Sequence, residues 1–155
     1  MKKPATSSLK STALRLLATR EHSRKELRRK LEAKAEEGDD VEAVLDRMVE
    51  TGLQSDARFA ESFVRSRSGR LGAARIRREL SDRGVAEDLA ATALDEVLVD
   101  DELSRARSVW GKKFGQAPAD RQDWARQARF LQSRGFSADV IRKLLKEPFD
   151  EPAEG

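Results

Sequence analysis

Residues 75–85 read RIRRELSDRGV, and residues 126–136 read RQARFLQSRGF. A shift of 51 residues lays the first stretch on the second. It pairs Arg75 with Arg126, Arg78 with Arg129, Leu80 with Leu131, Arg83 with Arg134 and Gly84 with Gly135. Self-similarity at a fixed period is the sequence signature of a repeat protein, so we predict that the chain is built from copies of one structural unit.

A more divergent copy lies near the start of the chain. A shift of 49 residues pairs Arg29 with Arg78 and Leu31 with Leu80, while Ala35 stands where the other copies have glycine. Three units of about 50 residues nearly fill the 155-residue chain. We therefore predict repeats at residues 9–53, 54–98 and 99–147, with a flexible N-terminal tail at 1–8 and a flexible acidic tail at 148–155.

Each unit has the apolar spacing of three helices, and no stretch alternates as a strand does. Ser23 and Glu26 form a capping box that begins a helix, and Asp39 and Glu42 resemble a second such start. Gly52 is a natural helix stop. A 50-residue unit is only marginally stable alone. The sequence therefore predicts an all-α protein whose three-helix repeats stack into an elongated solenoid.

Composition narrows the class of protein. Charged residues make up 38% of the chain, and there is no cysteine and one histidine. Without cysteine the protein has no disulfides and no thiolate metal sites. Because no apolar run is long enough for a membrane span or a signal peptide, we expect a soluble, cytoplasmic protein. We also expect a monomer.

Charge alternates along the chain in blocks. Residues 1–35 carry 11 basic and 3 acidic side chains, residues 36–61 carry 2 and 9, and residues 84–102 carry none and 7. The basic blocks fall on the expected middle helices, where a line of cations can meet phosphate or an acidic protein surface. The alternative is a solvated face whose cations pair with acids of the adjacent third helix. The candidate binding residues are Arg24, Lys25, Arg28, Arg29, Arg65, Arg67, Arg70, Arg75, Arg77, Arg78, Arg126, Arg129 and Arg134.

Two other functions are disfavoured. A helix-turn-helix reader would set its third helices against DNA, yet residues 39–50 and 87–96 are strongly acidic. Trp124 is the one aromatic residue that we single out as a candidate base stacker, against a plain packing role. His22, between two expected helices, is interpreted as a capping or packing residue rather than a catalyst. With no phosphate-binding glycine loop and no metal-ligand spacing, we expect no enzyme activity, no metal and no cofactor.

Several segments together resemble the RecX family, the regulators of the bacterial recombinase RecA. They span about residues 14–145 and comprise residues 20–27 (REHSRKEL) with Leu31, residues 55–60 (SDARFA) with Phe63-Val64, residues 75–80 (RIRREL) with Arg83-Gly84-Val85, and residues 130–137 (FLQSRGFS). The chain departs from the family pattern in the first unit, which lacks the glycine after Lys34 and has a gap in the match at residues 36–40.

The resemblance implies three tandem three-helix repeats in a curved, elongated molecule. It also implies binding to RecA and to the RecA filament on single-stranded DNA, with inhibition of filament growth, ATP hydrolysis, strand exchange and co-protease activity. Roles in homologous recombination, DNA repair and the SOS response go with that partner, and so does direct contact with single- or double-stranded DNA. The alternative is a non-enzymatic DNA-binding protein that acts through its basic face without RecA.

Overall fold

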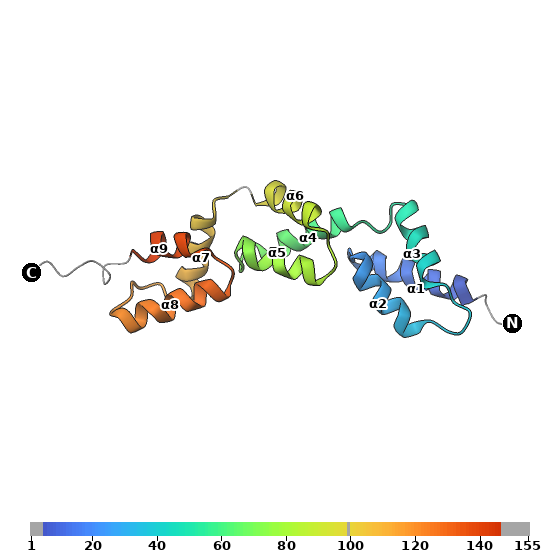
Figure 1. Ribbon diagram of the computed structural model, residues 1–155, viewed down its shortest axis with the longest axis horizontal. Coiled ribbons are helices and arrows are strands. Elements are labelled where there is room, and N and C mark those ends of the chain that lie inside the picture. The colour runs from blue at the N-terminus through green and yellow to red at the C-terminus, as the bar shows by residue number, and fades with distance from the viewer. Residues whose placement is uncertain (1–4, 99, 147–155) are drawn as a thin grey trace, which may run out of the picture. The chain divides into compact units, whose positions relative to one another are not determined.

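The computed structural model describes residues 5–98 and 100–146 of the chain. Within these ranges it contains α-helices and no β-strand, which confirms the all-α prediction (Figure 1). The helices are α1 (Ala5–Thr19), α2 (Arg24–Lys34), α3 (Val41–Glu50), α4 (Asp56–Arg67), α5 (Ala73–Asp82), α6 (Glu87–Val97), α7 (Glu102–Lys113), α8 (Arg121–Ser133) and α9 (Ala138–Leu145).

The first helix is longer than its sequence pattern indicated. α1 begins at Ala5, so residues 5–8 of the predicted N-terminal tail belong to this helix. Between Ala5 and Thr19 the sequence contains no glycine or proline that would break a helix. Residues 1–4 and the predicted acidic tail, 148–155, lie outside the described residues.

Helix starts follow side-chain capping. The capping box predicted at Ser23 is present, with the Ser23 hydroxyl accepting from the Glu26 N–H and Glu26 Oε1 accepting from the Ser23 N–H, both at 3.1 Å. The predicted start at Asp39 is wrong by one residue. Asp40 is the N-cap of α3 and accepts from the Ala43 N–H at 3.0 Å, whereas Asp39 accepts from the Glu36 N–H in the preceding turn.

The chain forms two compact units. Of the described residues, the first unit holds those up to Phe63 together with Leu80–Ala93, and the second holds Val64–Glu79 together with those from Leu94 onward. In the first unit α1, α2 and α3 pack on one another, and in the second unit α7, α8 and α9 do the same. The first core consists of Leu9, Ala13, Leu27, Leu31, Val44, Leu45 and Met48, and the second of Ala106, Val109, Leu131, Phe136, Ile141 and Leu145.

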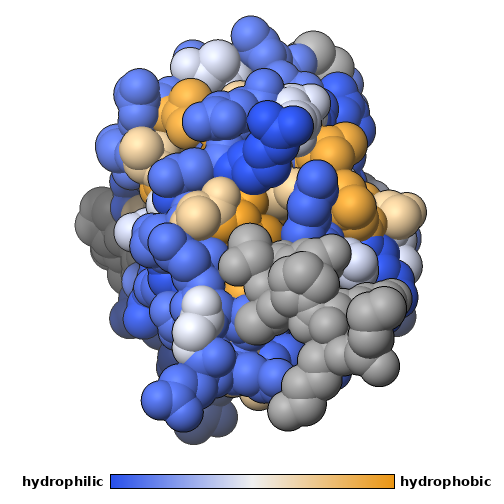
Figure 2. All heavy atoms as spheres, turned by 90° about the vertical axis from the view of Figure 1, so that its right-hand side faces the viewer, coloured by the Kyte–Doolittle hydropathy of each residue, from blue (hydrophilic) through white to orange (hydrophobic). Residues whose placement is uncertain are grey.

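Hydrophilic residues cover most of the face that Figure 2 presents, and hydrophobic residues interrupt it in places. Among the described residues, the large hydrophobic side chains left exposed are Leu14, Val49 and Leu53. No helix in residues 5–98 and 100–146 is long and apolar enough to cross a bilayer.

Candidate functional site

A basic residue at the start of α2 lies against a glycine that ends α5. Gly84 has φ +81°, and a Cβ atom built on it would come within 2.8 Å of Lys25 Cβ. The Lys25 ammonium donates to the carbonyl oxygen of Asp82 at 3.1 Å. Lys25 therefore covers Gly84 with its aliphatic stem and caps an unpaired carbonyl at the end of α5 with its charge.

The same arrangement recurs at the start of α5. Gly135 has φ +93°, and a Cβ atom built on it would come within 2.5 Å of the Arg75 backbone nitrogen. Arg75 Nη1 donates to the carbonyl oxygen of Ser133 at 2.8 Å. In both places the accepting carbonyl lies two residues before the glycine, as the 51-residue shift requires.

Acidic residues complete the two contacts. Asp56, at the start of α4, accepts from the Arg24 N–H at 2.8 Å, and Glu102, at the start of α7, accepts from the Ala73 N–H at 2.9 Å. Each carboxylate caps the first turn of a middle helix, where the helix dipole favours negative charge. We call each set of contacts, at Lys25–Gly84 and at Arg75–Gly135, a repeat junction. Lys25 and Arg75, both candidate binding residues, thus hold the fold together.

Arg24 and Arg28 are engaged in ion pairs with α3. Arg24 Nη2 lies 2.7 Å from Asp46 Oδ1, and Arg28 Nε and Nη2 lie 2.9 and 3.0 Å from the two oxygens of Glu42. The hydrogen bonds from Arg28 lower the pKa of Glu42 below its ordinary value. For Arg24 and Arg28 the structure therefore shows the alternative interpretation of the basic face, in which its cations pair with acids of the third helix.

Other candidates are held within their own domain. Arg67 lies 3.8 Å from Glu79, and Arg126 pairs with Asp123 at 2.7 Å and stacks over Phe114. Arg134 stacks over the ring of Phe130, with its guanidinium carbon 4.9 Å from the centroid. Arg77 is exposed but is not free of partners.

The side chains of five candidates are exposed and have no hydrogen-bond, ion-pair or ring partner among the described residues. They are Arg29, Arg65, Arg70, Arg78 and Arg129. Three of these occupy the same place in successive middle helices, because Arg29, Arg78 and Arg129 each precede a fully buried leucine by two residues. Two helical residues span about 200°, so the arginine faces away from the core that the leucine enters. We call these three residues the equivalent arginines.

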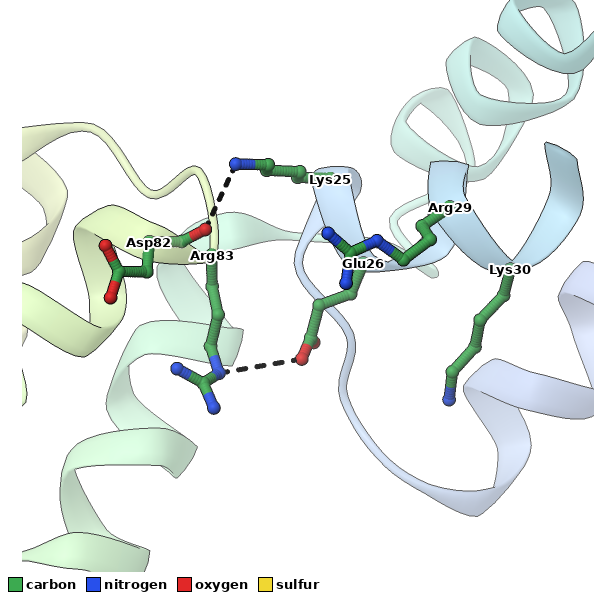
Figure 3. Close-up of a pocket in the computed structure, with 6 residues that line it drawn as sticks. All are labelled: Lys25, Glu26, Arg29, Lys30, Asp82 and Arg83. Carbon is green, nitrogen blue, oxygen red and sulfur yellow. Dashed lines mark hydrogen bonds and ion pairs between the residues drawn. The ribbon is translucent and has the colours of Figure 1, made fainter. Parts of the chain in front are cut away.

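A hollow of about 400 Å³ lies between α2 and the end of α5 (Figure 3). It is lined by Lys25, Glu26, Arg29, Lys30, Asp82 and Arg83. Arg83 lies 3.7 Å from Glu26 and over the Phe63 ring at 4.6 Å. Lys30 and Arg83 were not among the sequence candidates. The repeat match between Arg83 and the candidate Arg134 is the sequence signal that points to Arg83.

His22 and Trp124 have packing roles. His22 is fully buried, with Nδ1 3.0 Å from the Arg20 carbonyl oxygen and Nε2 3.0 Å from the Lys30 ammonium. Burial is the main cause that lowers the pKa of His22, which leaves the ring neutral and able to accept from Lys30. Trp124 packs partly buried against the second core with its indole nitrogen buried, which agrees with the plain packing role rather than with base stacking. No group of three or more potential metal ligands occurs in the described part of the chain.

These features define a class of protein: tandem three-helix domains whose middle helices are locked to the following domain by a basic residue and a glycine. The chain belongs to the RecX family. Models of its first, second and third three-helix domains match residues 10–48, 55–94 and 100–145. The resemblance identified in the sequence is thereby confirmed, including its three three-helix domains.

Relatives and solved structures agree. The chain is 51% identical over 139 residues to the regulatory protein RecX of Leptothrix cholodnii, covering 90% of this chain and 88% of that protein. Identity to the regulatory protein RecX of Herminiimonas arsenicoxydans is 47%, with 90% and 91% covered. The crystal structure of RecX from Lactobacillus salivarius superposes with a TM-score of 0.74 at 23% identity, covering 92% of this chain and 96% of that one, which supports the fold.

Proposed function

We propose that this protein regulates the RecA recombinase by binding RecA and the RecA filament on single-stranded DNA. The observation that carries the proposal is the match of all three domains to the RecX family, whose curated members are named as regulatory proteins. Binding would restrain filament growth, ATP hydrolysis, strand exchange and co-protease activity. A partner of this kind places the protein in the bacterial cytoplasm, in the pathways of recombination, DNA repair and the SOS response.

The equivalent arginines are the part of the basic face best suited to such a partner. Arg28 and Arg75 already have intramolecular acceptors, so a partner would have to displace those contacts. An exposed guanidinium without a partner can pair with a carboxylate or phosphate and break no contact within the fold. A filament presents the same groups again on every protomer. This repetition suits a chain whose three middle helices each present an exposed arginine without a partner among the described residues.

The test replaces all three equivalent arginines by glutamine and titrates the variant into RecA that hydrolyses ATP on single-stranded DNA. Glutamine keeps a long, helix-forming side chain and removes the charge. If each contact contributes about 0.5 kcal/mol, as exposed ion pairs do, the concentration for half-inhibition rises about tenfold. The matched control is Arg15→Gln with Arg47→Gln and Arg142→Gln, which removes three other exposed arginines without partners in the described structure.

Equal inhibition by the wild type and the equivalent-arginine variant would reject this surface. The alternative function, DNA binding without RecA, is separated by stoichiometry. A factor directed at the filament inhibits at amounts far below those needed to coat the DNA, whereas a protein that only coats DNA inhibits when it is in comparable amount.

A further inference from the structure

The hollow beside α2 gathers cations from two elements far apart in the sequence. Lys25, Arg29 and Lys30 come from α2, and Arg83 directly follows α5 (Figure 3). Two acids, Glu26 and Asp82, share the lining. The six side chains carry a formal charge of +2, and all belong to the first compact unit.

The acidic charge of Glu26 is already engaged. Its oxygens accept from the Ser23 N–H at 3.1 Å and lie 3.5 Å from Arg20 and 3.7 Å from Arg83. The negative charge of Glu26 is therefore partly neutralised by Arg20 and Arg83, and it repels an anionic ligand less than a free carboxylate would. Asp82 is exposed, and its carboxylate has no partner among the described residues.

Donors remain available at the hollow. Arg29 has no partner in the described structure, so its whole guanidinium is free. The one hydrogen bond from the Lys25 ammonium goes to the Asp82 carbonyl oxygen, and an ammonium group has three N–H donors. Two residues from the same helix, Lys25 and Arg29, lie four residues apart and so share one face.

The shape of the hollow selects the kind of anion. Lys25, Arg29 and Asp82 are exposed and none of the six lining residues is fully buried, so a small ion would keep most of its surface in water. Small-molecule sites instead bury most of their ligand. No lining residue is aromatic, so bases have nothing to stack on. An extended polyanion that lays one charged group after another across the opening fits these features.

We propose that this hollow binds the phosphodiester backbone of a single nucleic-acid strand, with Arg29 as the principal phosphate contact and Asp82 as the group that weakens it. The inference rests on the proposed function for the choice of partner, and it assigns the DNA contact to one place on the chain. Backbone contacts of this kind are independent of sequence and weaken with salt.

The experiment measures binding to a fluorescein-labelled oligo-dT strand of about 30 nucleotides by anisotropy, with no RecA present. Arg29→Gln should weaken binding about threefold to fivefold and reduce the magnitude of the log–log salt slope by about 0.7, the value for one phosphate contact on a single strand. Arg47→Gln is the matched control. Arg47 is an exposed arginine of α3 whose side chain has no partner in the described structure and does not line this hollow, so its loss should change affinity less than half as much.

Asp82→Asn tests the opposite direction. Removing its charge should tighten binding about twofold to threefold, because a unit negative charge at the lining of the hollow would no longer repel the phosphate through water. A gain in affinity cannot come from a damaged fold. Asp95→Asn is the control, because Asp95 is an exposed acid of α6 without a partner in the described structure and its loss changes net charge equally.

Three outcomes would overturn the inference. One is equal weakening by Arg29→Gln and Arg47→Gln, and another is equal tightening by Asp82→Asn and Asp95→Asn. The third is displacement of the strand by inorganic phosphate or polyglutamate at a matched charge concentration, which would point to a free anion or an acidic peptide. Because RecA is absent, these results leave the ATPase test of the proposed function independent.

Discussion

Replacing Gly135 by alanine tests the repeat junctions most directly. Gly135 has φ +93°, and an added Cβ would lie 2.5 Å from the Arg75 backbone nitrogen and 2.9 Å from its Cα. Neither atom can move without shifting the start of α5. That shift would break the bond from Arg75 Nη1 to the Ser133 carbonyl oxygen and the 2.7 Å bond from the Gly72 N–H to the Arg134 carbonyl oxygen.

The magnitude has two parts. A side chain at positive φ costs roughly 1–2 kcal/mol. Forcing an extra methyl group into a packed contact costs typically 1–3 kcal/mol more. Gly135→Ala should therefore lower the free energy of unfolding by about 2–5 kcal/mol.

Two other glycines separate these parts. Gly52 has φ +76° with nothing within 4 Å of an added Cβ, so Gly52→Ala should show the conformational cost alone. Gly84→Ala brings its added Cβ to 2.8 Å from Lys25 Cβ, a less severe overlap than the 2.5 Å approach to the Arg75 backbone nitrogen at Gly135, and its loss of stability should fall between the two. Urea unfolding followed by helical circular dichroism measures the series. Equal losses for Gly135→Ala and Gly52→Ala would show that the junction is not a steric contact.

Three further changes probe the packing around the helix ends. Ser23→Ala removes the hydroxyl of the capping box and should cost about 1 kcal/mol, measured as a lower urea midpoint. Below about pH 6.5 the unfolded chain takes up a proton that folded His22, with its lowered pKa, resists, so the free energy of unfolding should fall as pH drops through that value. His22→Gln should remove this step, whereas persistence of the step in the variant would assign it to another group. Gln127→Leu leaves the indole N–H of Trp110 without its 2.7 Å acceptor and should cost about 1–3 kcal/mol, with a change in tryptophan fluorescence on unfolding as the readout. No loss of stability in Gln127→Leu would mean that this N–H finds another acceptor.

Helix ends and repeat positions could be predicted because they are local. Ser23 with Glu26 forms its capping box within four residues, and the glycines at 84 and 135 follow the last turn of their helices. Their contacts with Lys25 and Arg75 could not be predicted, because they join residues 57 to 60 positions apart, and the sequence does not show which repeat surface meets which.

The basic face illustrates the same limit. Arg28 and Arg29 are equal candidates by sequence, yet Arg28 pairs with Glu42 and Arg29 is free in the described structure. The difference is a turn of about 100° around α2, which decides whether a guanidinium reaches α3. Whether an arginine reaches an acid of the neighbouring helix depends on how the two helices pack. Composition and charge blocks cannot predict that packing.

The middle repeat carries both halves of a repeat junction. Arg75, near the start of α5, covers Gly135 of the third repeat. Gly84, just after the end of α5, is covered by Lys25 of the first repeat. A second copy of this segment, inserted next to the first, could therefore form a repeat junction with the domain on either side of it. Each junction would use the same basic residue and glycine as the existing ones. The contacts between neighbouring domains therefore permit the protein to lengthen by internal gene duplication. An engineered protein with four domains could be built by repeating the middle segment.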